Sequence, residues 1–459
     1  MLDQTEAPLS ERALFPTVAR GEAVGALLAL SGTLLLILSP STALSAASLA
    51  LLVAGLALLP ALGPVLIGLV LPFYLHPKPL GSMEFSLPEL ILLSGVLGAS
   101  IYTLRHRGRF RRSLAGLATP LDGPVAIFLA AALLSLLASE VPRVSLRDLR
   151  ILVLEPVAAY YLAVWFLRDR SDLLAVASAL LLGGAAAAIS GLYQYLFTDH
   201  VVAVEGVRRV LGPYLSPNHL GLYLGRLLPI AVALLLFLPR VRIPAALLSA
   251  TLAAALLLTF SVGSWLASAV ALLAVALLRR PRTAFALAGA FALLLVAAAP
   301  VLRLERIASH FSLSGGTSFL RLRLWESSLQ MIRDHPLLGV GMDNFLYHYR
   351  TAYMLPEAAA EPNLSHPHNL ILNFWLQMGI LGLASVVWLL YGLARLWLRL
   401  WHTALDPVGR ALLAGIAGAT VDLVVHGMVD NSYFLVDLAF HFWLCAAAVV
   451  ILDKLRPQP

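Results

Sequence analysis

The stretch SHPHNLILNFWLQMGILGL, residues 365–383, decides the fold of this chain. After Ser365 come a histidine, a proline and a second histidine, and an apolar run with helical spacing follows directly. The apolar run continues to Ala394, which gives the roughly 20 residues that a helix needs to cross a bilayer. The sequence therefore predicts that His366 and His368 stand at the mouth of a membrane-spanning helix.

The composition of the whole chain indicates a membrane protein. Of the 459 residues, 60% are hydrophobic and 12% are charged, and the mean hydropathy is +0.87. Soluble domains carry about 25% charged residues, so an ordinary globular protein is excluded. The apolar runs do not alternate as the strands of a membrane barrel do, and we expect an all-α, polytopic transmembrane bundle. Cys445, the only cysteine, lies in an apolar run, which leaves no disulfide framework.

About fourteen apolar segments follow one another, and twelve to fourteen spans are expected because only PALGP separates the second from the third. They lie near residues 23–39, 43–60, 62–76, 86–104, 121–139, 148–167, 172–196, 219–238, 243–260, 264–278, 283–301, 369–394, 409–427 and 436–452. The first run lacks the pattern of a cleaved signal and is expected to be retained. The predicted parts are a cytoplasmic N-terminal segment (1–22), an N-terminal transmembrane bundle (23–301), a large extracytoplasmic loop (302–368) and C-terminal transmembrane helices (369–459).

The arginines indicate the orientation of the bundle. The net charge is +7, and six short basic segments fall on one side when the helices are counted alternately, which predicts that this side is cytoplasmic. These segments are residues 105–112, 168–170, 239–242, 279–282, 395–402 and 453–456. The segment SEVPRVSLRDLR disagrees, because it puts Arg143, Arg147 and Arg150 on the outer side. Either this segment is misplaced or its cations have a use there.

The predicted outer loop is far longer than a connection between helices requires. It holds five of the chain's twelve histidines, and its arginines and acidic residues balance. Its stretch RLRLWESSLQMI, residues 321–332, has apolar residues at helical spacing. We therefore expect a small, partly helical cap over the outer face of the bundle.

Three places in the predicted outer segments are candidates for chemistry. His368 can accept a proton from a hydroxyl near neutral pH, although a polar residue that caps a helix would look the same. In RRVLGPYLSPN, Arg208 and Arg209 precede a helix N-terminus, which suits either a phosphate or lipid headgroups. Arg321 and Trp325 lie one helical turn apart, a spacing that amphipathic packing also explains.

Other polar residues give weaker signals. His366 and His368 could bind a metal ion, but the sequence marks no third ligand and no metal is expected. Pro367 restricts His366 to an extended backbone, so the two imidazoles are expected to diverge, with His366 at the rim. Arg226 lies about two turns inside a helix and must face a cavity or a partner. The ionisable residues predicted within the membrane form no relay along one helix; they are Glu155, Arg226, Asp422, His426, Asp437 and His441.

Three segments together resemble the O-antigen ligase and O-antigen polymerase family of bacterial membrane glycosyltransferases. The family pattern of His, then Asn, Ser or Gln, nine residues, Gly, two residues and Gly is met by His368, Asn369, Gly379 and Gly382. The stretch RLRLWESSLQMIRDHPLLGVGMDNF is similar to the family's Arg-x-x-x-Trp segment and the turn that follows it. The stretch RVLGPYLSPNHLGLYL is similar to the family's entry to a helix, and the similarity covers about residues 205–450.

The resemblance implies a GT-C-like fold in the bacterial cytoplasmic (inner) membrane. It also implies transfer of a glycan from undecaprenyl pyrophosphate to an acceptor sugar hydroxyl on the outer face, with inversion and without a cofactor or a required metal. The partners would be the lipid-linked donor, a glycan or lipid-glycan acceptor and membrane lipids, and not nucleic acid. His368 would be the catalytic residue, and the substrate-binding residues would be Arg208, Arg209, Asn218, Arg321, Arg323, His366 and Asn369.

One residue departs from the family pattern. Val262 stands where the family has an arginine thought to hold the donor's pyrophosphate, which puts donor handling in doubt and makes an inactive relative conceivable. Its role could pass to another arginine, and the candidates are Arg143, Arg147, Arg226 and Arg323.

Two other functions stay open. A protein O-oligosaccharyltransferase would use the same donor with a serine or threonine acceptor, and a transporter would carry bicarbonate or a lipid-linked sugar. Transporters place ionisable residues near the membrane midplane and show internal repeats. No repeat is evident and the polar residues gather on one face, which favours an enzyme. Polymerisation of repeat units and attachment of a finished chain both fit the sequence.

Overall fold

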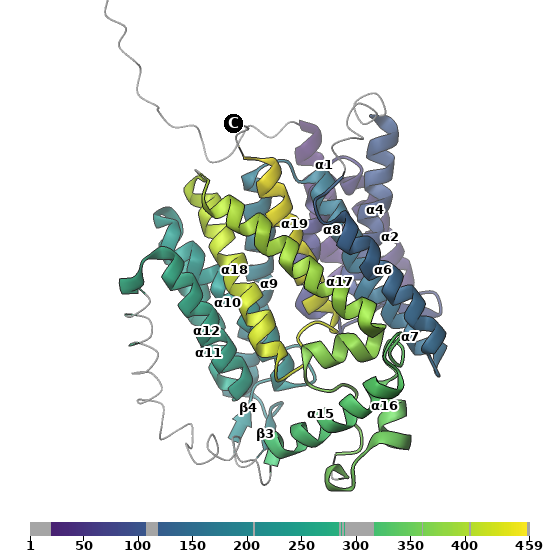
Figure 1. Ribbon diagram of the computed structural model, residues 1–459. Coiled ribbons are helices and arrows are strands. Elements are labelled where there is room, and N and C mark those ends of the chain that lie inside the picture. The colour runs from purple at the N-terminus through teal and green to yellow at the C-terminus, as the bar shows by residue number, and fades with distance from the viewer. Residues whose placement is uncertain are drawn as a thin grey trace, which may run out of the picture.

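The computed structural model describes residues 20–106, 118–204, 207–283, 316–359, 361–403 and 405–456, together with positions 286 and 289. In these ranges the chain is an all-α polytopic bundle, as predicted (Figure 1). Ten of the described helices are long and apolar enough to cross a membrane, and three shorter apolar helices pack among them. Thirteen of the fourteen predicted apolar segments are helical, and the remaining one, 283–301, lies almost wholly outside the described residues.

The apolar helices follow the predicted order, and residues 43–76 form two separate helices. The bounds are α1 (Arg20–Leu38), α2 (Thr42–Leu56), α3 (Leu62–Val70), α4 (Leu87–Arg105), α6 (Asp122–Ser135), α7 (Pro142–Asp148), α8 (Glu155–Phe166), α9 (Arg170–Phe197), α10 (Pro217–Phe237), α11 (Arg242–Leu258), α12 (Val262–Arg279), α17 (Leu370–Trp401), α18 (Pro407–Gly427) and α19 (Val436–Lys454). A π-helical stretch, Leu149–Leu154, joins α7 to α8. Two short antiparallel hairpins pair β1 (Lys78–Leu80) with β2 (Met83–Phe85) and β3 (Val202–Val204) with β4 (Val207–Arg209).

One hydrophobic core runs through the described bundle from α1 to α19. The C-terminal helices are packed into the N-terminal ones: α18 lies against α10 and α12, α17 against α6, and α19 against α8. α10 and α19 are the most deeply buried of the ten long helices. Both helices are enclosed by their neighbours, which shield them from lipid. The ends of α10, α18 and α19 are therefore held in fixed positions for the site described below.

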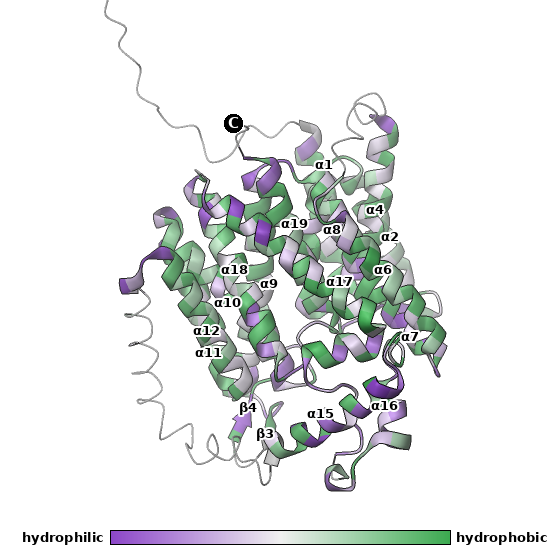
Figure 2. Ribbon diagram, in the orientation of Figure 1, coloured by the Kyte–Doolittle hydropathy of each residue, from purple (hydrophilic) through white to green (hydrophobic). Residues whose placement is uncertain are grey.

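Polar residues gather at two opposite ends of the bundle (Figure 2). At the end that holds the C-terminus, the basic segments predicted to be cytoplasmic lie together: Arg399 and Arg456 pair with Asp453, and Arg170 pairs with Asp406. The opposite end carries the β3–β4 hairpin and the helices of the predicted outer loop (Figure 1). The segments 168–170, 395–402 and 453–456 therefore lie at one end of the bundle, as predicted, and most of residues 105–112 lie outside the described ranges. That this end is cytoplasmic stays a prediction.

The segment that disagreed with the charge rule lies at the opposite end, where two of its three arginines have partners. Arg147 pairs with Asp148 and with Asp343 of the outer loop, and Arg150 pairs with Glu89. Arg147 and Arg150 therefore neutralise carboxylates at the end that carries the predicted outer loop, and that this end faces outward stays a prediction.

The outer loop forms a small helical cap over this end. α15 (Gly316–Asp334) covers the predicted helical stretch, and α16 (Phe345–His348), a π-turn (Tyr349–Tyr353) and a 3₁₀ turn (Pro356–Ala358) follow it. The cap has a hydrophobic core of its own, separate from that of the bundle, to which α17 contributes Leu376. Residues 302–315 of the predicted loop lie outside the described ranges.

Candidate functional site

The helix α17 is bent where the sequence pattern has its first glycine. Gly379 has a φ of 67° and a ψ of −172°, so the short helix that begins at Leu370 changes direction there. A side chain at this position would meet the Leu337 carbonyl oxygen, and one at Gly339 would meet the Leu376 carbonyl. Glycine is therefore required for the backbone angle at Gly379 and for the close approach of the two chains. The result is that the turn HPLLGVG is fixed against the short first part of α17.

Polar contacts connect this turn to the rest of the bundle. Val340 N–H donates to the Leu376 carbonyl at 2.7 Å, and Asp343 N–H donates to the Gln377 side chain at 3.1 Å. Asn344 accepts a hydrogen bond from Val141 N–H, ahead of α7, at 2.8 Å. The turn therefore joins α17 to α7, which makes the first part of α17 a rigid platform at the outer-loop end.

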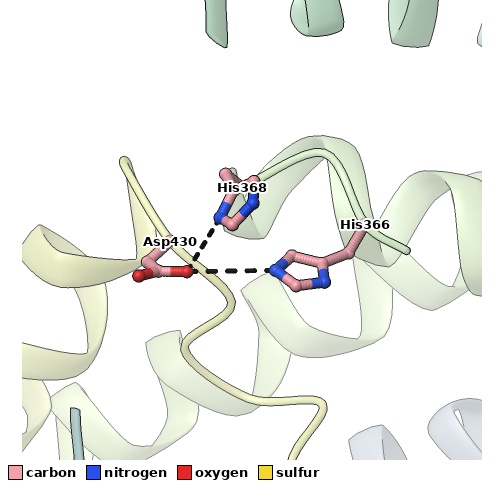
Figure 3. Close-up of side chains that lie close together, drawn as sticks. All are labelled: His366, His368 and Asp430. Carbon is pink, nitrogen blue, oxygen red and sulfur yellow. Dashed lines mark hydrogen bonds and ion pairs between the residues drawn. The ribbon is translucent and has the colours of Figure 1, made fainter. Parts of the chain in front are cut away.

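His368 stands immediately before this platform, and its imidazole pairs with a carboxylate. Its Nδ1 lies 2.9 Å from Oδ1 of Asp430, in the loop between α18 and α19 (Figure 3). His366 reaches toward the same oxygen, with its Nε2 3.9 Å away. Asn369 caps α17 by accepting from the N–H groups of Ile371 and Leu372. The three side chains of this His–His–Asp cluster come from two segments more than 60 residues apart.

The prediction that the two imidazoles diverge is wrong. His368 has a positive φ of 49°, a left-handed conformation that turns its side chain back toward His366. The ring centres are consequently 4.2 Å apart. The backbone restriction that Pro367 places on His366 is not enough to separate the rings, because His368 supplies the turn.

Contacts within the cluster shift the pKa values of Asp430 and His366. Burial raises the pKa of Asp430, but the two neighbouring imidazoles outweigh burial and hold it well below its usual range. Burial lowers the pKa of His366, as do the nearby His368 and Arg321. Asp430 is therefore a carboxylate at neutral pH. A proton on Nδ1 of His368 satisfies that carboxylate and leaves Nε2 as the basic nitrogen.

Arg321 and Arg323 face different surroundings on α15. Within the described residues, Arg321 makes no hydrogen bond or ion pair, and its charge acts on His366. Arg323 pairs with Glu326 at 2.7 Å and lies over the Phe319 ring. Residues two apart on a helix point to nearly opposite sides, so the structure brings Arg321, and not Arg323, toward the cluster. Trp325, the other member of the pattern, donates from its indole to the Pro367 carbonyl at 3.0 Å.

The residues before α10, Arg208 to Ser216, lead into the N-terminus of that helix. Ser216 caps α10 by accepting from Asn218 N–H, with Pro217 in the first turn. The Asn218 side chain accepts from the Arg209 guanidinium at 2.7 Å, and Arg209 also donates to the Thr259 carbonyl at 2.7 Å. Arg208 points elsewhere, since it donates to the Thr198 carbonyl and lies over the Tyr195 ring. Of the two paired arginines, Arg209 therefore lies beside the segment that leads into α12.

The start of α12 links Arg209 to the His–His–Asp cluster. A side chain at Gly263 would touch Val429, the neighbour of Asp430, at 3.3 Å and the His426 ring at 3.4 Å. Thr259, which binds Arg209, precedes the Ser-Val-Gly sequence at this helix start by two residues. The three segments that carried the family resemblance are thus brought to one end of the bundle.

Three candidates for the role left open at Val262 have other partners. Arg147 is held by Asp148 and Asp343, and Arg323 by Glu326. Arg226 is fully buried in α10 and donates to the carbonyls of Leu438 and Ser432 and to the Ser432 hydroxyl, which are the partners that the sequence required for it. The fourth candidate, Arg143, is exposed on α7.

Asp430 is the residue of the cluster that sequence reasoning missed. It lies in MVDNSYF, a short polar link between two apolar helices, where an acidic residue looks like an ordinary turn. Within the described residues, His366, His368 and Asp430 form a group whose ligand atoms lie within 4.8 Å of one another. The signal that could have found it is spatial: α17 and α18 pack together, and their ends meet at this loop.

Residues 244–389 match a family model described as O-Antigen ligase. The match includes α11, α12, the cap and the motif from His368 to Gly382, and it ends before Asp430. A search of curated proteins finds no match.

Proposed function

Because residues 244–389 match an O-antigen ligase family model and the protein has many membrane-spanning helices, we propose that the chain transfers a glycan from undecaprenyl pyrophosphate to an acceptor sugar hydroxyl. The observation that carries the proposal is the His368–Asp430 pair beside the starts of α12 and α17. An imidazole oriented by a carboxylate is suited to take a proton from a hydroxyl. The proposed site is the bacterial inner membrane, with the cap on the outer side.

In the proposed reaction, Nε2 of His368 accepts the proton of the acceptor hydroxyl. The hydroxyl oxygen forms a bond to the anomeric carbon of the donor sugar on the face opposite the leaving group, and the bond to undecaprenyl pyrophosphate breaks with its electron pair. The anomeric configuration is therefore inverted. The step as proposed uses no metal ion, and general-base help of this kind contributes about 10²–10⁴ in rate.

Arginines and helix N-termini would hold the pyrophosphate. Arg321 carries a guanidinium without a described partner, and Arg209 lies beside the N-termini of α10 and α12. Guanidinium groups and helix N-termini both favour phosphate oxygens. We propose that Arg209 takes over the role of the arginine that Val262 replaces, because it binds the carbonyl of Thr259 in the segment that leads to that position.

An apolar cavity of about 230 Å³ lies between α17, α18 and α19. It is lined mainly by aliphatic and aromatic side chains, among them Trp397, Ile416 and Phe442. Its α17 residues, Leu390 to Trp397, lie in the half of that helix away from the cluster. We propose that the distal part of the donor's polyprenyl chain occupies it, because an apolar lining suits a hydrocarbon.

The test of function is the surface glycan of a deletion strain, complemented with wild-type protein or with His368→Ala. Loss of long chains with single repeats attached indicates a polymerase, and free lipid-linked polymer indicates a ligase. Unaltered surface glycan together with unglycosylated target proteins would favour a protein O-oligosaccharyltransferase instead. A wild-type glycan on both lipids and proteins would overturn the glycosyltransferase assignment.

The proposed orientation is tested separately by labelling from outside the cell. With Cys445 replaced by alanine, a cysteine at the exposed Glu357 of the cap should react with an impermeant maleimide, and one at the exposed Arg240 should not. The opposite pattern would reverse the bundle and exclude an outer-face reaction.

A further inference from the structure

The His–His–Asp cluster has the composition of a transition-metal site. Two imidazole nitrogens and one carboxylate oxygen are ligands that Zn²⁺ binds at about 2.0–2.2 Å, so tetrahedral geometry spaces neighbouring ligands by roughly 3.3 Å. In the cluster, Asp430 Oδ1 lies 2.9 Å from His368 Nδ1 and 3.9 Å from His366 Nε2. These two spacings lie on either side of the required one, and all three ligand atoms lie within 4.8 Å of one another.

Neighbouring contacts orient the ligand atoms. Ser365 Oγ lies 3.0 Å from Nδ1 of His366, which directs Nε2 of the same ring toward Asp430. That Nε2 is buried and has no hydrogen-bond partner. Asn431 N–H donates to Asp430 Oδ1 at 2.8 Å. Metal-binding histidines and carboxylates in proteins are commonly fixed by such second contacts, and here they direct His366 Nε2 and Asp430 Oδ1 toward each other.

We propose that His366, His368 and Asp430 bind one Zn²⁺ ion, with water in the fourth position, and that this ion inhibits glycan transfer. The inhibitory part rests on the proposed function, whereas the binding part does not. The side chains of His366 and His368 are 22% and 20% exposed, so the edge of the cluster meets solvent. This site is regulatory and is not needed for the reaction.

The inhibition follows from the two nitrogens of His368. In the metal-free pair, the proton is on Nδ1 and the basic lone pair is on Nε2. Zn²⁺ binds an unprotonated nitrogen. When it occupies Nδ1, the single ring proton of the neutral imidazole moves to Nε2. That nitrogen then no longer accepts the acceptor's proton, and the added positive charge opposes formation of an imidazolium.

The binding test uses full-length protein in detergent, stripped with a chelator and titrated with ZnCl₂ in a calorimeter. We expect one Zn²⁺ per chain, and an affinity at least about 10-fold lower for His366→Ala and for Asp430→Asn. The matched control is His335→Ala, since His335 and His348 form a second histidine pair within the described part of the cap, with ring centres 5.5 Å apart. A wild-type protein that binds no Zn²⁺, or a His366→Ala protein that binds it with unchanged affinity, overturns the proposal.

The functional test compares transfer by each variant with and without Zn²⁺, relative to its own metal-free rate. Wild-type transfer should fall at least 10-fold at saturating Zn²⁺ and recover with EDTA, while His366→Ala should lose most of this sensitivity. Equal sensitivity in both proteins contradicts inhibition through this cluster. If wild-type protein transfers no glycan even without Zn²⁺, the proposed function fails, and the calorimetric result still decides whether the ion binds.

Discussion

Two histidines of this protein stand at the start of a membrane helix and pair with an aspartate, and their surroundings differ. His219, in the first turn of α10, has its Nε2 3.0 Å from Asp437 Oδ1. Tyr214 stacks on that ring at 4.1 Å and donates its hydroxyl to Asp437 Oδ2. His368 makes a similar contact with Asp430 at 2.9 Å. The same pair of residue types is thus built twice at one end of the bundle.

The two pairs differ in how far their imidazoles are exposed. Asp437 is fully buried, and it also accepts from Leu438 N–H, so the pair at α10 is enclosed by protein groups. A buried pair of this kind, with its lone pairs satisfied, fixes the helix entry. At α17 the side chain of His368 is 20% exposed, and within the described residues Nε2 has no hydrogen-bond partner. Under the proposed function, the partly exposed imidazole at α17 reacts, whereas the enclosed one at α10 holds the fold.

The largest expected effect is on His368. His368→Ala should lower the rate of glycan transfer about 10²-fold or more, because the base for the acceptor hydroxyl is removed. The measurement is transfer by purified protein in proteoliposomes with a lipid-linked donor. His366→Ala serves as the matched neighbour and should reduce the metal-free rate much less. A wild-type rate for purified His368→Ala protein would refute the assignment.

The second prediction concerns the enclosed pair. His219→Ala should destabilise the protein by about 3 kcal/mol, because it leaves the buried Asp437 carboxylate without its imidazole partner. Thermal unfolding in detergent should show a lowered midpoint, and protein that stays folded at low temperature should transfer glycan at a rate close to wild type. A folded His219→Ala protein that has lost transfer like His368→Ala would remove the distinction between the two pairs.

Much of the fold can be predicted from the sequence because a lipid bilayer restricts which structures can cross it. A run of about 20 apolar residues has no stable alternative to a helix in a bilayer, and the described segments accordingly match the predicted ones. The sequence pattern marks Gly379 as a position that needs glycine. It does not show that the reason is the close approach of the backbone at Leu337.

The candidate site is less visible, because it depends on contacts between distant segments. Nothing near His368 in the sequence marks Asp430, which lies 62 residues away. The convergence of His366 and His368 follows from a positive φ that is uncommon outside glycine. Arg321 and Arg323 cannot be told apart in the sequence. The structure distinguishes them because they point to opposite sides of α15 and because Arg323 pairs with Glu326.

A third prediction tests the carboxylate behind the open histidine. Asp430→Asn keeps the shape and an oxygen that accepts from His368 Nδ1, but it removes the negative charge that stabilises the imidazolium. We expect kcat to fall about 10-fold with little change in the KM for the donor. Steady-state kinetics at varied donor concentration separates the two constants. An unchanged kcat with a raised KM would mean that Asp430 binds substrate and does not position the base.

The smallest expected effect separates two arginines of α15. Arg321→Lys should lower transfer several-fold at limiting donor, because an ammonium group cannot reproduce a bidentate contact with pyrophosphate oxygens. Arg323→Lys is the matched control on the same helix, and it should have little effect because Arg323 is paired with Glu326. Surface pairs of that kind contribute about 0–1 kcal/mol, so its fold should also survive. If donor saturation does not restore the rate of Arg321→Lys, the guanidinium acts in the transfer step itself. If Arg321→Lys matches wild type while Arg323→Lys is impaired, then Arg323, and not Arg321, faces the donor.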